Sequence, residues 1–161
     1  MAPVQNILAG MGGGSLWALA VVWGGQGLSF GFLMLPMVMP LAMIAPGLVT
    51  IAMIATLAAR RFFDRSVTNG QPFAEGSPGW VDGRVLANTM EQAVLALLLW
   101  PFVAMTLGGN VVLVMGLAFA VARLAFWAGY RLSPPLRAFG FAATFFPTIL
   151  ATVWSLVAWL G

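Results

Sequence analysis

The sequence predicts an all-α integral membrane protein, a four-helix bundle preceded by an additional N-terminal transmembrane helix. Of its 161 residues, 61% are hydrophobic and 7% are charged, whereas a soluble domain carries about a quarter charged residues. The apolar residues gather in stretches close to the roughly 20 residues that cross a bilayer as a helix. We expect a single membrane domain over residues 1–161, with an N-terminal extension at 1–32 and the four-helix core at 33–161.

The N-terminal extension is the least regular of the apolar stretches. Residues 16–22 are apolar, but glycines occupy positions 12–14 and 24–25, and glycine weakens a helix. Residues 7–59 together are too long for one crossing. We therefore expect an additional helix over residues 15–34, which gives five crossings. A surface-lying or re-entrant segment is the alternative.

Four core helices are expected at residues 33–59, 85–107, 111–130 and 138–160. Backbone groups in lipid must be satisfied internally, so helices are the form that these stretches adopt. The first is interrupted by Pro36, Pro40 and Pro46, and Gly108-Gly109-Asn110 forms a minimal turn between the second and third.

The arginines predict the orientation in the membrane. The loop after the first core helix carries Arg60, Arg61 and Arg65, Arg84 ends it, and Arg131 and Arg137 lie between the third and fourth helices. Both loops must lie on one side, and the positive-inside tendency places that side in the cytoplasm. With five crossings the N-terminus is cytoplasmic and the C-terminus is outside. We expect a bacterial inner membrane.

Composition also excludes several kinds of chemistry. The chain has no cysteine and no histidine, so we expect no disulfide, no metal site and no histidine-ligated haem. Its net charge of +3 does not indicate nucleic-acid binding, because no soluble basic face exists to follow a phosphate backbone.

Three polar residues share one face at the start of the second core helix. Arg84, Asn88 and Glu91 are spaced 0, 4 and 7 residues apart, which stacks their side chains on a helix. Ionisable groups at the edge of an apolar segment are costly and by default mark a functional site. The alternative is that Glu91 pairs with Arg84 or Arg123 and only joins the helices.

The third core helix carries Arg123, Phe126 and Tyr130 on one face, and Arg137 follows in the next helix. Arg123 lies two turns into the membrane from Tyr130, so a buried anionic partner is expected for it. Glu91 cannot neutralise all the nearby arginines. The excess positive charge therefore predicts an anionic ligand, one with carboxylates.

These residues carry a resemblance to a family. The matching pieces are Arg84-x-x-x-Asn88-x-x-Glu91, Ala122-Arg123-Leu-Ala-Phe-Trp-Ala-Gly129-Tyr130, Pro135-Leu136-Arg137, and Ala59-Arg60-Arg61. Over about residues 50–160 the chain resembles the membrane-associated proteins of eicosanoid and glutathione metabolism (the MAPEG family). That family includes microsomal glutathione transferases, prostaglandin E synthase and leukotriene C synthase.

The resemblance implies a homotrimer that binds glutathione, as a cosubstrate, between neighbouring subunits near the cytoplasmic surface. The residues implied to hold glutathione are Arg84, Asn88, Glu91, Arg123, Tyr130 and Arg60. Arg137 would lie beside the sulfur and favour the nucleophilic thiolate, and Arg61 matches a proton donor to the second substrate. Two departures stand out: Phe126 replaces a tyrosine of the leukotriene enzyme, and the N-terminal extension is absent from the mammalian four-helix members.

From these features we expect an enzyme, a glutathione-dependent transferase or peroxidase acting on lipophilic substrates that partition into the bilayer. The alternative is a non-catalytic trimeric protein of the same family, which binds lipid or acts as a scaffold. Arg137 favours the enzyme and Phe126 favours the scaffold. A transporter or channel is disfavoured because the polar residues cluster at one level rather than lining a path.

Overall fold

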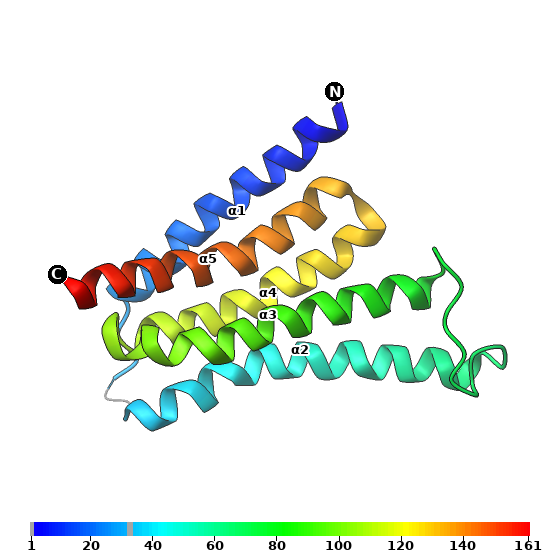
Figure 1. Cartoon of the computed structure of the whole chain (residues 1–161), viewed down its shortest axis with the longest axis horizontal. Helices are drawn as coiled ribbons and strands as arrows, with labels where there is room; N and C mark the ends of the chain where they lie inside the picture. Colours follow the sequence, from blue (N-terminus) through cyan, green and yellow to red (C-terminus); the bar gives the residue numbers. More distant parts are fainter. Residues whose placement is uncertain (1, 32–33) are drawn as a thin grey trace.

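The computed structural model describes residues 2–31 and 34–161, and within them the regular structure is helical. The helices are α1 (Ala2–Gly27), α2 (Leu35–Phe63), α3 (Pro78–Thr106), α4 (Gly109–Leu132) and α5 (Pro134–Leu160). All five are long and apolar enough to cross a membrane. The prediction of an all-α bundle of membrane-spanning length is therefore confirmed (Figure 1).

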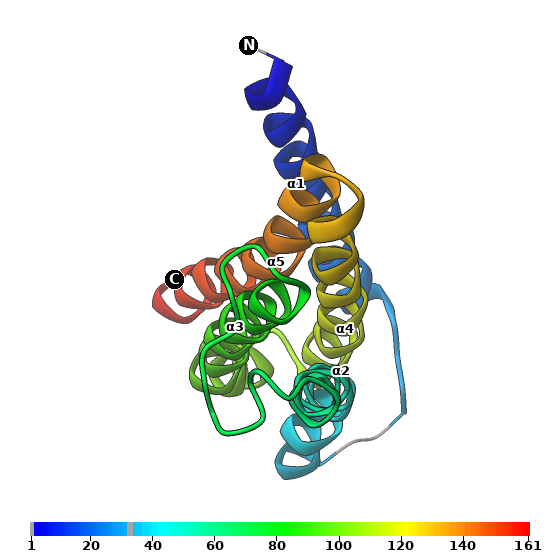
Figure 2. The ribbon, with the colours of Figure 1, turned by 90° about the vertical axis from the view of Figure 1, so that its right-hand side faces the viewer.

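The helices pack around α4, which contacts all four others (Figures 1 and 2). Over the residues that the structure describes, the N-terminal helix α1 contacts only two of them, α5 and α4. The interior is built from small and branched side chains around a few large ones. Trp100 of α3 is buried and packs edge-on against Phe119 of α4, while its indole Nε1 donates a hydrogen bond to Thr148 Oγ1 of α5 at 3.1 Å. Aromatic packing and a satisfied indole together join three helices.

The observed bounds of the first helix correct the prediction. A helix over residues 15–34 was expected, but α1 begins at Ala2 and ends at Gly27, and part of the predicted C-terminal end (residues 32–33) lies outside the described residues. The glycines are the physical reason. A Cβ on Gly10 would collide with the Pro135 carbonyl, and one on Gly14 would collide with Ala142. Small residues at a four-residue spacing let helices in membranes approach closely, so here they stabilise packing and the helix continues through them.

The second helix extends past its predicted end, from residue 59 to Phe63, so Arg60 and Arg61 lie in its last turn and not in the loop. The expected start at residue 33 lies outside the described residues. Pro36 lies in the first turn of α2, where proline is tolerated. The helix continues through Pro40 and Pro46 to Phe63.

The two connections that arginines flank lie at one end of the bundle, as their positions in the sequence predict, although Arg84, Arg131 and Arg137 themselves lie within helices. In Figure 1 the loop between α2 and α3, the turn between α4 and α5, and the start of α1 all lie toward the right-hand side, and the C-terminus lies at the opposite end. We call this the arginine-rich end. It holds most of the charged side chains of the chain.

Candidate functional site

A cavity of about 630 Å³ opens at the arginine-rich end among α1, α3, α4 and α5. Three charged side chains line it, Arg84, Glu91 and Arg137, and all three are exposed. The other lining residues are Ile7, Met11, Ala87, Asn88, Phe126, Tyr130, Pro134, Ala138 and Phe141. Five of the predicted site residues therefore line one cavity: Arg84, Asn88, Glu91, Tyr130 and Arg137.

The start of α3 sets the register of the charged wall. The Ser77 hydroxyl accepts a hydrogen bond from the Trp80 backbone N–H at 3.2 Å, which caps the helix, and Pro78 fits its first turn. The helical spacing then brings Arg84 and Glu91 to the cavity. The Arg84 guanidinium carbon lies 4.9 Å from the centroid of the Trp80 ring, a cation–π contact that positions it at the mouth.

Glu91 has a neutral partner. Asn88 Nδ2 donates a hydrogen bond to Glu91 Oε2 at 3.1 Å. Among the described residues, the ion pairs of the chain do not include Glu91, so the alternative in which it pairs with Arg84 or Arg123 is not observed. An exposed carboxylate held by an amide remains open to a cationic group of a ligand.

Arg123 lies behind the cavity wall and is fully buried, with 0% exposure. Its Nη1 donates to Asn88 Oδ1 at 2.8 Å, its Nε to Thr144 Oγ1 at 2.9 Å, and its Nη2 to the Gly140 carbonyl at 3.0 Å. The expected anionic partner is therefore replaced, in the described structure, by neutral oxygens. Because an arginine can only donate, it holds the Asn88 oxygen inward and leaves the Asn88 amide nitrogen for Glu91.

Tyr130 and Arg137 are brought together by the tight connection of α4 to α5. Gly129 contacts the backbone at Arg137, where a Cβ would collide, and this close approach places the start of α5 on the end of α4. The Arg137 guanidinium carbon lies 5.0 Å from the centroid of the Tyr130 ring. Tyr130 in turn packs edge-on against Phe126. The result is a cation held over an aromatic ring at the cavity edge.

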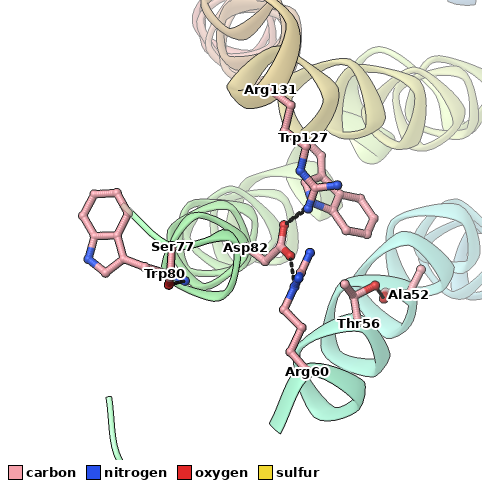
Figure 3. Close-up of polar contacts among 8 residues, drawn as sticks. All are labelled: Ala52, Thr56, Arg60, Ser77, Trp80, Asp82, Trp127 and Arg131. Atoms are coloured by element: carbon pink, nitrogen blue, oxygen red, sulfur yellow. Dashed lines mark hydrogen bonds and ion pairs between the residues drawn. The ribbon is translucent and has the colours of Figure 1, made fainter. Parts of the chain in front are cut away.

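Arg60 lies elsewhere, in a cluster centred on a carboxylate that the sequence analysis did not single out (Figure 3). Asp82 is 1% exposed and accepts three hydrogen bonds: from Arg60 Nε at 2.6 Å, from Arg131 Nη2 at 2.7 Å and from Trp127 Nε1 at 2.7 Å. We call Arg60, Asp82, Trp127 and Arg131 the Asp82 cluster. It ties α2, α3 and α4 together at the arginine-rich end.

A signal for Asp82 was present in the sequence. It falls three residues before Val85 and seven before Thr89, both of which are buried. A carboxylate on the buried face of a membrane helix requires cationic partners. Asp82 lies two positions before Arg84 and therefore on a different face of α3 from Arg84, Asn88 and Glu91.

Arg61 organises the loop that follows α2. It donates hydrogen bonds to the carbonyls of Val67 and Gln71 at 3.3 and 3.2 Å, and its guanidinium carbon lies 4.9 Å from the Phe73 ring centroid. In the same loop the Ser66 hydroxyl and the Ser66 backbone N–H both donate hydrogen bonds to the Asp64 carboxylate. These bonds, the hydroxyl's first, lower the pKa of that carboxyl. Neither Arg60 nor Arg61 lines the cavity.

The described residues hold no group of three or more histidine, cysteine, aspartate or glutamate side chains that could bind a metal ion. The cavity offers instead guanidinium groups, one carboxylate, an amide and a phenol. Such a set can bind a small zwitterionic molecule with several carboxylates. It can also stabilise an anion beside Arg137.

Fold and site thus define a class, a helical membrane bundle with a charged cavity at one end. Comparison with family models sharpens this: the MAPEG family model matches residues 38–157, most of the chain, and the chain belongs to the MAPEG family. The resemblance noted in the sequence is confirmed. The protein is an integral membrane protein, and its membership of this family supports a role related to glutathione or eicosanoid metabolism. Comparisons with curated proteins and with solved structures found no match.

Proposed function

We propose that this protein is a glutathione-dependent transferase or peroxidase that acts on lipophilic substrates reaching it from the membrane. The observation that carries the proposal is the exposure of Arg84, Glu91 and Arg137 to one cavity. Glutathione bears one ammonium group, two carboxylates and a thiol. Its charges complement two guanidinium groups and one carboxylate, and charge-assisted hydrogen bonds are the strong ones.

The cavity suggests a place for each end of the tripeptide. Glu91 suits the ammonium group, and Arg84 suits a carboxylate. Asn88 and Tyr130 offer hydrogen bonds to the peptide. Arg123, being buried, acts through Asn88, whose orientation it fixes.

We assign Arg137 to the sulfur of glutathione, beside which its guanidinium group would lie. A guanidinium group close to a thiol favours the thiolate, which is the nucleophile. In conjugation the sulfur forms a bond to an electrophilic carbon, and the leaving group departs with its electron pair. In peroxide reduction two glutathione thiols are oxidised to a disulfide while the hydroperoxide is reduced to an alcohol and water. In both, the protein contributes proximity and electrostatic stabilisation.

A homotrimer is part of the proposal because of Arg60 and Arg61. Both lie outside the cavity of their own chain, and their side chains also bond Asp82 and the α2–α3 loop. Their remaining N–H groups reach a ligand only if a neighbouring subunit presents them. A closed three-fold ring would let each subunit present the end of its α2 to the next. Native mass spectrometry in a mild detergent is expected to show a trimer, and a monomer would contradict this part of the proposal.

The Arg137→Ala variant tests the chemistry. We expect it to bind glutathione within several-fold of wild type in calorimetry, yet to lose the ultraviolet absorbance of the bound thiolate and most conjugating activity. Arg65→Ala is the matched control, since Arg65 is an exposed arginine of the α2–α3 loop outside the cavity. A thiolate signal that survives in Arg137→Ala would contradict the assigned role.

A second candidate function rests on Phe126. It lines the cavity with a ring that carries no hydroxyl, so one hydrogen bond available to a phenol is missing, and the neighbouring wall is apolar. These features favour a lipid-binding or scaffold protein without glutathione chemistry. Absence of activity in wild type and in Arg137→Ala across several electrophiles would favour this alternative, whereas equal activity in both would show only that Arg137 is not the residue that activates the thiol.

A further inference from the structure

The N-terminal helix supplies part of the cavity wall. Ile7 and Met11 line the cavity, and their four-residue spacing places them on one face of α1. The family match begins at residue 38, so α1 lies outside it. This portion of the wall is therefore an addition to the part of the chain that defines the family.

Close packing fixes this wall in place. Gly10 meets the Pro135 carbonyl and Gly14 meets Ala142, while Trp17 packs edge-on against Phe139 with ring centroids 6.2 Å apart. These contacts hold α1 along α5. Because Arg137, Ala138 and Phe141 of α5 also line the cavity, the positions of Ile7 and Met11 relative to Arg137 are set by one helix pair.

The cavity is divided by polarity. Its charged wall comes from α3, through Arg84 and Glu91, and its apolar wall includes Ile7, Met11 and Phe141. Within the described residues, α1 packs against α4 and α5 but not against α3, and Figure 2 shows α5 between α1 and α3. The two walls therefore stand on separate helices, and the residue assigned to the sulfur, Arg137, lies on the helix that carries α1.

We propose that Ile7 and Met11 bind the apolar group of the second substrate, so that the N-terminal helix determines which lipophilic electrophile or hydroperoxide is accepted. This inference rests on the proposed function. A hydrophobic group reacting at a sulfur beside Arg137 lies next to the α1–α5 pair, and burial of apolar surface there stabilises the complex. The charged wall holds the tripeptide, and the apolar wall distinguishes its reaction partners.

The test uses glutathione, S-methylglutathione and S-hexylglutathione as probes, titrated by calorimetry into the full chain in lipid nanodiscs. Each methylene that is buried rather than hydrated raises affinity about fourfold, so wild type should bind the hexyl probe at least about tenfold more tightly than the methyl probe. The double variant Ile7→Ala/Met11→Ala should lose about fivefold or more of that gain. It should bind glutathione itself as wild type does.

Leu16→Ala is the matched control. Leu16 is an exposed apolar residue of α1 outside the cavity lining, and nine residues after Ile7 it points to the opposite side of the helix. The Leu16→Ala variant should keep the full gain in affinity from S-methylglutathione to S-hexylglutathione. An unchanged gain in the double variant, or an equal loss of affinity for all three probes, would overturn the inference while leaving the proposed function standing. Absence of glutathione binding by wild type would overturn the proposed function and the inference with it.

Discussion

Two groups of side chains lie at the arginine-rich end, and each contains two arginines and one carboxylate. In the Asp82 cluster the carboxylate is buried and bonded by both arginines and an indole. In the second, which we call the cavity group (Arg84, Glu91 and Arg137), the carboxylate is exposed and its protein partner is a neutral amide. The net formal charge is the same in both groups, but the Asp82 carboxylate is buried whereas the Glu91 carboxylate is exposed.

The difference separates a structural role for the Asp82 cluster from the binding role that we propose for the cavity group. The buried Asp82 carboxylate accepts three hydrogen bonds from protein groups, two of them from arginines, and thereby joins α2, α3 and α4. In the cavity group, Arg84 contacts the Trp80 ring and Arg137 contacts the Tyr130 ring. The Glu91 carboxylate accepts a hydrogen bond from the Asn88 amide. Its charges are positioned but not neutralised by one another, which leaves them for a ligand.

The largest expected effect is on stability, from removal of the Asp82 charge. Asp82→Asn should lower the free energy of unfolding by about 2–4 kcal/mol, since breaking a fully buried ion pair costs roughly 3–5 kcal/mol. The effect is smaller here because the Arg60 and Arg131 side chains are 32% and 49% exposed. The midpoint of thermal unfolding in detergent measures it.

Glu75→Gln is the control for that experiment. Glu75 is an exposed carboxylate of the α2–α3 loop, and its neutralisation should change stability by no more than about 0.5 kcal/mol. If the two variants unfold at the same temperature, the Asp82 cluster does not hold the helix ends together, and the comparison fails.

A smaller effect concerns the helix that walls the cavity group. Gly14→Ala should destabilise the protein by about 1–3 kcal/mol, the usual cost of overpacking, because its Cβ would collide with Ala142. Gly12→Ala meets nothing within 4 Å, and should be neutral or stabilise by up to about 1 kcal/mol through helix propensity. The unfolding midpoint should therefore fall in Gly14→Ala and stay unchanged or rise in Gly12→Ala, and equal shifts in the two variants would show that α1 is not packed as described.

The contrast between these glycines shows what the sequence could and could not predict about the fold. Stretches of about 20 apolar residues identify membrane-spanning helices because length and hydropathy are local properties. The role of Gly14 is not local. It depends on Ala142 of α5 lying opposite, so glycines that appear to weaken a helix begin to stabilise it only when the partner is known.

The candidate site divides in the same way. The spacing of Arg84, Asn88 and Glu91 places them together because a helix imposes one period on all three. The depth of Arg123 was also evident, but its partners Thr144 and Gly140 come from another helix and could not be inferred from spacing. Arg60 illustrates the limit most plainly, since its partner Asp82 lies 22 residues away on a different helix.

Calorimetric titration of glutathione into Glu91→Gln, with Glu75→Gln as the matched control, tests most directly whether the cavity group is a ligand site. A charge-assisted hydrogen bond contributes about 1.5–3 kcal/mol, so Glu91→Gln should weaken binding roughly 10- to 150-fold while the protein still folds and assembles. Arg84→Ala should behave alike, and Glu75→Gln should bind as wild type does. Glutathione affinity that is unchanged in Glu91→Gln would contradict the account and show that the cavity group only joins helices.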